Sequence, residues 1–338
     1  MTTTDQTQHN LGRDEHGRGG RAVLLGLVAL TLVAALGVLF NRGVGPLPDR
    51  EGCTARVGDT VVELNTEQAE NASLIAAIAV RRGLPARAVS IALATAYQES
   101  KLYNLKHGDR DSLGLFQQRP SQGWGSMTQV RDPYFATNAF YDALEKVDGY
   151  QQMRITEAAQ RVQRSGFPEA YEDHAADGRA LASALTGWSP HRFSCVVHRP
   201  RTEPAAETTG KQGLTPRAAA VRRDVEQAFG PLSLGGFAPG GVSTGHMTGS
   251  AHYDGRAIDV FVRPVNAENR RRGWAVASYL VAHAQRLDID HVIFDKRIWT
   301  SGSRSESGWR DYEPASDRGE RVVLEHRDHV HVDVLPGS

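Results

Sequence analysis

The sequence predicts a multi-domain chain that begins with a transmembrane helix, continues with an all-α domain and ends with an α+β domain. Three observations predict this: an apolar run near the N-terminus, helical spacing through the middle, and two alternating segments near the C-terminus. The expected boundaries are 1–21 for a disordered cytoplasmic segment, 22–40 for the membrane helix, 41–196 for the all-α domain, 197–216 for a linker and 217–338 for the α+β domain.

The apolar run at residues 22–40 is nineteen residues long and contains no charged side chain. At 1.5 Å per residue, a helix of this length just spans a hydrocarbon core of about 30 Å. A cleaved signal peptide is the alternative, but its apolar region is usually shorter, and no Ala-x-Ala motif follows Phe40. We therefore expect a single-pass anchor with a cytoplasmic N-terminus and extracytoplasmic domains; cleavage of the helix would make the protein secreted.

Charge and cysteine content narrow the possible functions and locations. The 39 basic and 39 acidic residues give a net charge of zero, so nothing indicates a nucleic-acid partner. Cys53 follows the apolar run, and Cys195 lies near the end of the first globular stretch. Two cysteines in an exported chain favour one disulfide, because the cytosol would keep them reduced.

Helical spacing dominates residues 69–187, with helices expected over 70–82, 87–102, 135–147 and 156–164. The second helix is apolar nearly all round from Ala88 to Tyr97, so we expect it to be buried on all sides. Near its end stands Glu99, facing the negative end of the helix dipole and partial desolvation. Both effects favour a protonated carboxyl group, which is what protonation of a glycosidic oxygen requires. A helix-end carboxylate paired with an arginine is the structural alternative.

The pair Glu99-Ser100, followed by Gly-Leu-Phe-Gln at 114–117, resembles the catalytic and groove motifs of goose-type lysozymes and lytic transglycosylases. The resemblance implies a lysozyme-like domain in which Glu99 is the acid/base and Gln117 lines the sugar groove. The family's later Ala-Tyr-Asn segment should fall near 158–163, where this chain reads Ala-Ala-Gln-Arg-Val-Gln. The choice between hydrolysis and transglycosylation therefore stays open.

Two alternating segments in the C-terminal domain predict strands that carry metal ligands. Along 256–262 Asp259 lies on one face, and along 329–334 His329, His331 and Asp333 share the face opposite three valines. If the strands are neighbours with the valines in the core, Asp259 and His331 point into a common cleft. His252 precedes the first strand on a glycine-containing turn. Imidazoles and a carboxylate are the ligands of open, catalytic zinc sites.

Residues 250–259, together with the late His-x-His, resemble the zinc peptidases that include D-alanyl-D-alanine carboxypeptidases, lysostaphin-like endopeptidases and the hedgehog fold. The resemblance covers roughly residues 214–334. It implies one Zn²⁺ ion, bound by His252, Asp259 and His331. Ser250 is expected on the substrate-binding side. His246 and His326 are expected to be loop residues and not ligands.

The identity of the general base stays open. Many carboxypeptidase members place a glutamate three residues before the last histidine, where this chain has Asp328, so Asp328, His329 and Glu325 are all candidates. Zinc lowers the pKa of a bound water to about 7, and a nearby acid or imidazole then takes its proton. Arg297 or Arg310 could hold a substrate carboxylate through two hydrogen bonds.

Both resemblances imply the same polymer, peptidoglycan. We therefore predict a membrane-anchored, extracytoplasmic peptidoglycan hydrolase that cuts glycan strands with Glu99 and stem peptides or crosslinks with zinc. One alternative is a wall-binding or scaffold protein with one or both sites inactive. Another is a zinc peptidase whose lysozyme-like part only binds glycan.

Overall fold

The computed structural model describes residues 1–2, 51–198, 206–315 and 317–337. We call residues 51–198 the N-terminal part and residues 206–337 the C-terminal part; both belong to one compact unit, Arg50–Ser338. The predicted membrane helix and all but the first two residues of the predicted cytoplasmic segment lie outside the described residues. Within the described ranges, no helix is both long enough and apolar enough to cross a membrane.

The N-terminal part contains an antiparallel sheet of order β2-β1-β3, so the prediction of an all-α domain was wrong. Strand β1 (Gly52–Val57) pairs with β2 (Thr60–Leu64) through a tight turn and with β3 (Phe193–Val196) on its other side. Strand β3 has only four residues and lies far along the chain, which hides this pairing from local sequence patterns. The described residues therefore form a mixed α/β structure throughout.

The helices of the N-terminal part are α2 (Thr66–Arg81), α3 (Ala86–Ser100), α4 (Met127–Arg131), α5 (Pro133–Leu144), α6 (Ile155–Gln163) and α7 (Ala175–Leu185), with short 3-10 turns η1 (Pro120–Gln122) and η2 (Glu172–His174). Helix α3 is buried along nearly its whole length and packs against α7. The two helices approach closely because Gly178 has no side chain: a Cβ there would lie 2.7 Å from the carbonyl oxygen of Ser90. This packing fixes the end of α3, where Glu99 lies.

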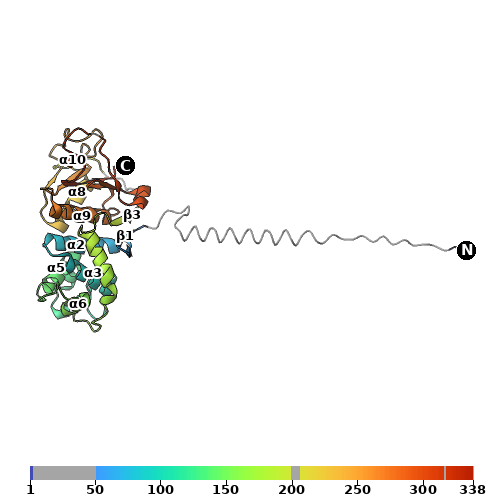
Figure 1. The fold of residues 1–338 in the computed structure, drawn as a ribbon, viewed down its shortest axis with the longest axis vertical. Coiled ribbons are helices and arrows are strands. Elements are labelled where there is room, and N and C mark those ends of the chain that lie inside the picture. Colours follow the sequence, from blue (N-terminus) through green and yellow to red (C-terminus); the bar gives the residue numbers. More distant parts are fainter. Residues whose placement is uncertain (3–50, 199–205, 316, 338) are drawn as a thin grey trace. The chain divides into compact units, whose positions relative to one another are not determined.

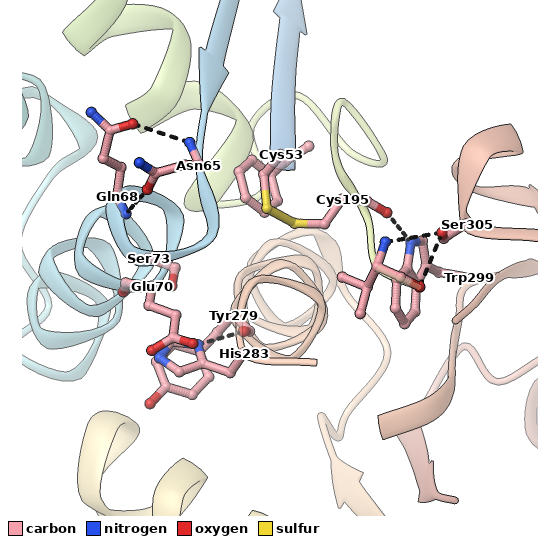
Figure 2. Close-up of a disulfide and its surroundings, with 12 residues drawn as sticks. Cys53, Asn65, Gln68, Glu70, Ser73, Cys195, Tyr279, His283, Trp299 and Ser305 are labelled. Atoms are coloured by element: carbon pink, nitrogen blue, oxygen red, sulfur yellow. Dashed lines mark hydrogen bonds between the residues drawn. A yellow bond between two sulfur atoms is a disulfide. The ribbon is translucent and has the colours of Figure 1, made fainter. Parts of the chain in front are cut away.

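The predicted disulfide between Cys53 and Cys195 is present and joins β1 to β3 (Figure 2). The C-terminal part contacts β3 beside this bridge. The indole Nε1 of Trp299 donates to the carbonyl of Cys195 at 3.0 Å, and the Ser305 hydroxyl accepts from the amide of Val197 at 3.0 Å. The bridge therefore lies at the junction of the two parts.

The C-terminal part is built on an antiparallel sheet of order β4-β5-β9-β6-β7-β8 within the described residues. Its strands are β4 (Leu234–Gly235), β5 (Ala257–Phe261), β6 (Ile289–Phe294), β7 (Arg297–Thr300), β8 (Arg310–Asp311) and β9 (His329–Val334). Its helices are α8 (Pro216–Phe229), α9 (Ala267–Ala282), the 3-10 turn η3 (Gly302–Ser307) and the short α10 (Arg321–Leu324). The valines of β9 are buried, as the alternation of this segment predicted.

Helix α9 packs between the sheet and the helices of the N-terminal part. It contacts β6 and β9 of its own sheet, and also α2 and α7 (Figure 1). Every residue from Gly273 to Ala282 is therefore buried, including Trp274 and Tyr279. At the edge of this contact Arg286 bonds Asp224 at 2.8 Å and reaches Glu70 of α2 at 3.3 Å. One face of the sheet is thus closed by helices, and the metal-ligand candidates lie on the other.

Candidate metal centre and the Glu99 site

Strand pairing brings together the three residues that the sequence proposes as metal ligands. In the β5–β9 pair, Asp259 lies directly opposite His331. His252 reaches them from the turn before β5, and all three side chains are buried. His252 Nε2 is 3.2 Å from Asp259 Oδ1 and 3.1 Å from His331 Nδ1, and His331 Nδ1 is 3.1 Å from Asp259 Oδ1. The three donor atoms form a nearly equilateral triangle.

This triangle has the dimensions of a tetrahedral metal site. Ligand atoms placed about 2.0–2.1 Å from a tetrahedral zinc ion lie roughly 3.3–3.4 Å from one another. The observed separations are within about 0.3 Å of that value. The structure also groups His246 with His252 and Asp259, with ligand atoms within 4.8 Å of one another. The donor set therefore fits one small divalent cation.

The hydrogen bond made by one ring nitrogen of His252 decides which of its two nitrogens can bind a cation. His252 Nδ1 lies 2.7 Å from the carbonyl oxygen of Gly236, which can only accept, so Nε2 is left free to bind a cation. Burial alone would lower the pKa of His331, but hydrogen bonds to Asp259 and Asp333 raise that pKa to about 10. The same two imidazoles hold the pKa of Asp259 well below its usual range despite its burial. The pocket is thus set up to hold positive charge.

Of the three candidate bases, His329 lies nearest the donor triangle. Its Nε2 is 3.8 Å from Asp259 Oδ1, and its Nδ1 is 2.8 Å from Asp328 Oδ1. Asp328 is also bonded by Arg263 Nε at 2.7 Å, so it lies behind the imidazole. Glu325 is bonded by Arg321 and Arg327, at 2.7 Å each. Among these three residues, His329 therefore lies beside the donor triangle, and Asp328 lies between its imidazole and Arg263.

Two histidines that were expected to be ordinary loop residues line the same cleft. The ring of His246 stacks on His252 with centroids 3.9 Å apart, and Tyr253 holds the His246 backbone through its hydroxyl. The ring of His326 lies 4.6 Å from that of His329. Neither residue belongs to a periodic segment, so alternation could not place them. The only available signal was their proximity in sequence to the proposed ligands.

The donor triangle opens into a cleft of about 770 Å³. Ser250 lines this cleft, together with Phe261, Ile293 and Tyr312, which give it an apolar wall. The two arginines proposed to hold a substrate carboxylate are not among its lining residues. Arg297 forms an ion pair with Asp311 at a second, smaller cavity. Arg310 donates a hydrogen bond to the Thr300 hydroxyl.

Glu99 lies half-buried in the last turn of α3. Its Oε1 accepts a hydrogen bond of 2.6 Å from the Tyr171 hydroxyl, and Gln163 also bonds the carboxylate. Burial raises the pKa of Glu99, and the bonds from Tyr171 and Gln163 offset only part of that rise. The amide of Gln163 also reaches the carbonyl of Phe116 at 2.8 Å, tying Glu99 to the Gly-Leu-Phe-Gln segment.

The other groups near Glu99 have structural roles. The Ser100 hydroxyl donates to the carbonyl of Leu115 at 2.7 Å and so joins α3 to the same segment. Gln117 has a left-handed backbone, and its side-chain amide turns back to the carbonyl of Gly114 at 3.2 Å. The partners of Glu99 therefore come from α6 and the segment after it. Tyr171 was missed by sequence reasoning, because only the fold brings it to α3.

Comparison with known proteins gives one partial match. The family model described as "VldE, C-terminal domain" matches residues 210–323, which is less than half of the chain. The matched segment contains His252 and Asp259 and stops before His329 and His331. No curated protein matches the chain.

Proposed function

We propose that this protein is a zinc-dependent peptidase that cleaves peptide bonds in peptidoglycan, acting outside the cytoplasm. The observation that carries the proposal is the triangle of donor atoms from His252, Asp259 and His331, with sides of 3.1 to 3.2 Å, at the base of an open cleft. The resemblance of residues 250–259 and the late His-x-His to murein-cleaving zinc peptidases supplies the substrate class. The disulfide supports an oxidising compartment.

Three residues would hold the ion, and a fourth would move the proton. A bound zinc ion supplies Lewis acidity and a water acidified to a pKa of about 7. The Nδ1–H group of His329 donates a hydrogen bond to the Asp328 carboxylate, which leaves the Nε2 lone pair facing the donor triangle. This atom can accept a proton during attack and return it to the departing amine. Asp328 fixes the ring and is itself held by Arg263.

The residues that line the cleft favour a short, partly apolar peptide as the substrate. Its wall of Phe261, Ile293 and Tyr312 can pack against alanine side chains of a stem peptide, and the Ser250 hydroxyl offers a polar contact at the entrance. A cleft of about 770 Å³ can enclose a few residues of such a chain.

The test compares metal content and muropeptide release for the wild type, His252→Ala and the control His107→Ala, an exposed histidine of the N-terminal part. We expect the wild type and His107→Ala to bind one zinc ion per chain and to release peptide-cleaved muropeptides. His252→Ala should lose both properties. Peptide cleavage by a chain without metal would overturn the proposal.

We propose a second activity, cleavage of the glycan strand by Glu99, which the raised pKa of that carboxyl group favours. A carboxyl group with a raised pKa keeps its proton to higher pH and can donate it to a glycosidic oxygen. Its bond to Tyr171 fixes the orientation of the group. Glu99→Gln should lose release of glycan fragments while leaving peptide cleavage intact.

The alternative proposals are a wall-binding scaffold with inactive sites and a peptidase whose Glu99 site only binds glycan. An unchanged muropeptide profile with retained binding to murein would favour the scaffold. Peptide products without any glycan products, from both the wild type and Glu99→Gln, would favour the single-activity enzyme.

A further inference from the structure

A second cluster of histidine and aspartate side chains adjoins the donor triangle and has no role in the proposed reaction. It consists of Asp290, His291 and Asp333, whose ligand atoms lie within 4.8 Å of one another. In the β6–β9 pair His291 lies opposite Asp333, two residues after His331. All three residues line the same cleft as the donor triangle. The cluster could bind a second ion, or it could serve the first.

The hydrogen bonds of Asp333 connect the two clusters. Its Oδ2 is 3.3 Å from His331 Nε2. Its Oδ1 accepts from the backbone amide of His291 at 3.1 Å and lies 2.9 Å from His291 Nδ1. The Asp333 side chain is only 13% exposed, so these hydrogen-bond partners, and not bulk water, hold its two oxygens in place. One carboxylate thus bridges two imidazoles.

This bridge determines which nitrogen of His331 is available as a ligand. A neutral imidazole carries one N–H and one lone pair. Asp333 can only accept when ionised, so the proton stays on Nε2 and the lone pair stays on Nδ1, which faces His252 and Asp259. Histidines that bind metals commonly donate their other nitrogen to a carboxylate or a carbonyl in this way.

We propose that Asp333, held by His291, is a positioning residue that fixes the ring and tautomer of His331 for metal binding. This inference rests on the proposed metal centre. His252 is oriented differently, by the backbone carbonyl of Gly236. Asp333 is therefore the side chain whose removal should loosen one ligand while leaving the other two in place.

A second ion at Asp290, His291 and Asp333 is the competing role for this cluster. Such an ion would take the Nδ1 lone pair of His291 and an oxygen of Asp333, the two atoms that now lie 2.9 Å apart. It would remove the hydrogen bond by which His291 holds Asp333 behind His331. The two roles therefore exclude each other, and the number of zinc ions bound per chain distinguishes them.

The test is a zinc titration of the full chain against a chromophoric chelator, for the wild type, Asp333→Ala, Asp333→Asn and Asp290→Asn. We expect one ion per chain in every case. Asp333→Ala should bind zinc 10- to 100-fold more weakly. Asp333→Asn keeps the volume and an accepting oxygen, so its affinity should fall only severalfold. Asp290→Asn, the control from the same cluster, should stay within about twofold of the wild type.

Folding and binding are separated by a second readout. Circular dichroism and thermal unfolding of the metal-free proteins check the fold, and the visible spectrum of the Co²⁺-loaded protein reports the ligand geometry. We expect a changed Co²⁺ spectrum for Asp333→Ala and an unchanged one for Asp290→Asn.

The outcomes distinguish this inference from the proposed function. Wild-type affinity and spectrum in a folded Asp333→Ala would overturn the positioning role alone. Two ions in the wild type and one in Asp333→Ala would overturn it in favour of a second metal site. No zinc binding by the wild type would overturn the proposed metal centre, and the positioning role with it.

Discussion

Replacing Gly236 with alanine should abolish metal binding although none of the ligand residues is changed. Gly236 lies beside β4, with φ at +78°, and its carbonyl holds His252 Nδ1. A Cβ at this position would lie 2.2 Å from His252 Cε1, 2.4 Å from Nδ1 and 3.0 Å from Asp259 Oδ2. Non-bonded carbon atoms pack at about 3.5–4.0 Å, so the imidazole must move by more than about 1 Å.

That displacement breaks the donor triangle. A shift of about 1 Å takes His252 Nε2 out of a geometry in which metal sites tolerate roughly ±0.2 Å. Losing one of three ligands should weaken zinc binding at least 100-fold, which is about 2.8 kcal/mol. The substitution also places an alanine in the left-handed backbone region, which costs roughly 1–2 kcal/mol of stability.

Gly240→Ala is the matched control. Gly240 belongs to the same glycine-rich segment and has φ at +82°, but a Cβ there would meet nothing within 4 Å. Both variants should therefore lose a similar amount of stability from backbone strain, and only Gly236→Ala should lose zinc. Chelator competition measures the affinities, and thermal unfolding without metal measures the strain. Zinc affinity of Gly236→Ala within threefold of that of Gly240→Ala would refute this reasoning.

Three further outcomes follow from other parts of the chain. Tyr171→Phe removes a hydrogen bond that stabilises the ionised form of Glu99, so the pKa of Glu99 should rise further. Glycan cleavage should then persist to higher pH. A pH–rate profile whose alkaline limb does not move would contradict this. Burial lowers the pKa of His283 (Figure 2) from 6.5 to about 4, so this histidine is neutral in the folded protein where the unfolded chain already binds a proton. Its contribution to the free energy of unfolding is therefore full above pH 6.5, and about 3 kcal/mol is lost as the pH falls to 4. Thermal unfolding across this range should show the loss in the wild type and a weaker pH dependence in His283→Phe. Reducing the Cys53–Cys195 bridge, whose residues are 142 apart in sequence, should lower the free energy of unfolding by about 5 kcal/mol in the chain-entropy model; unfolding curves with and without reductant measure it.

The paired strands of the metal centre were predictable because their sequences alternate. In β9 the valines alternate with His329, His331 and Asp333, so burying one set exposes the other to the cleft. The structure places Asp259 opposite His331, as two neighbouring strands required. The disulfide followed from the number of cysteines and the expected compartment. In these cases a short stretch of sequence, or a simple count, carried the information.

Other features depended on contacts between distant segments and could not be predicted. Strand β3 is too short to show alternation, so the three-stranded sheet was missed and the N-terminal part was wrongly expected to be all-α. His246 and Tyr171 lie in segments without periodicity, and only the fold brings them to His252 and Glu99. The arginines proposed for substrate binding pair with their own neighbours, which residue type alone does not reveal.

The most direct test of the peptidase proposal is mass spectrometry of the muropeptides released from murein by the wild-type protein, before chelation, after chelation and after zinc is restored. We predict that products of peptide-bond cleavage disappear with the chelator and return with zinc, while any products of glycan cleavage stay constant. Peptide-bond products that persist unchanged in the metal-free protein would contradict the central claim.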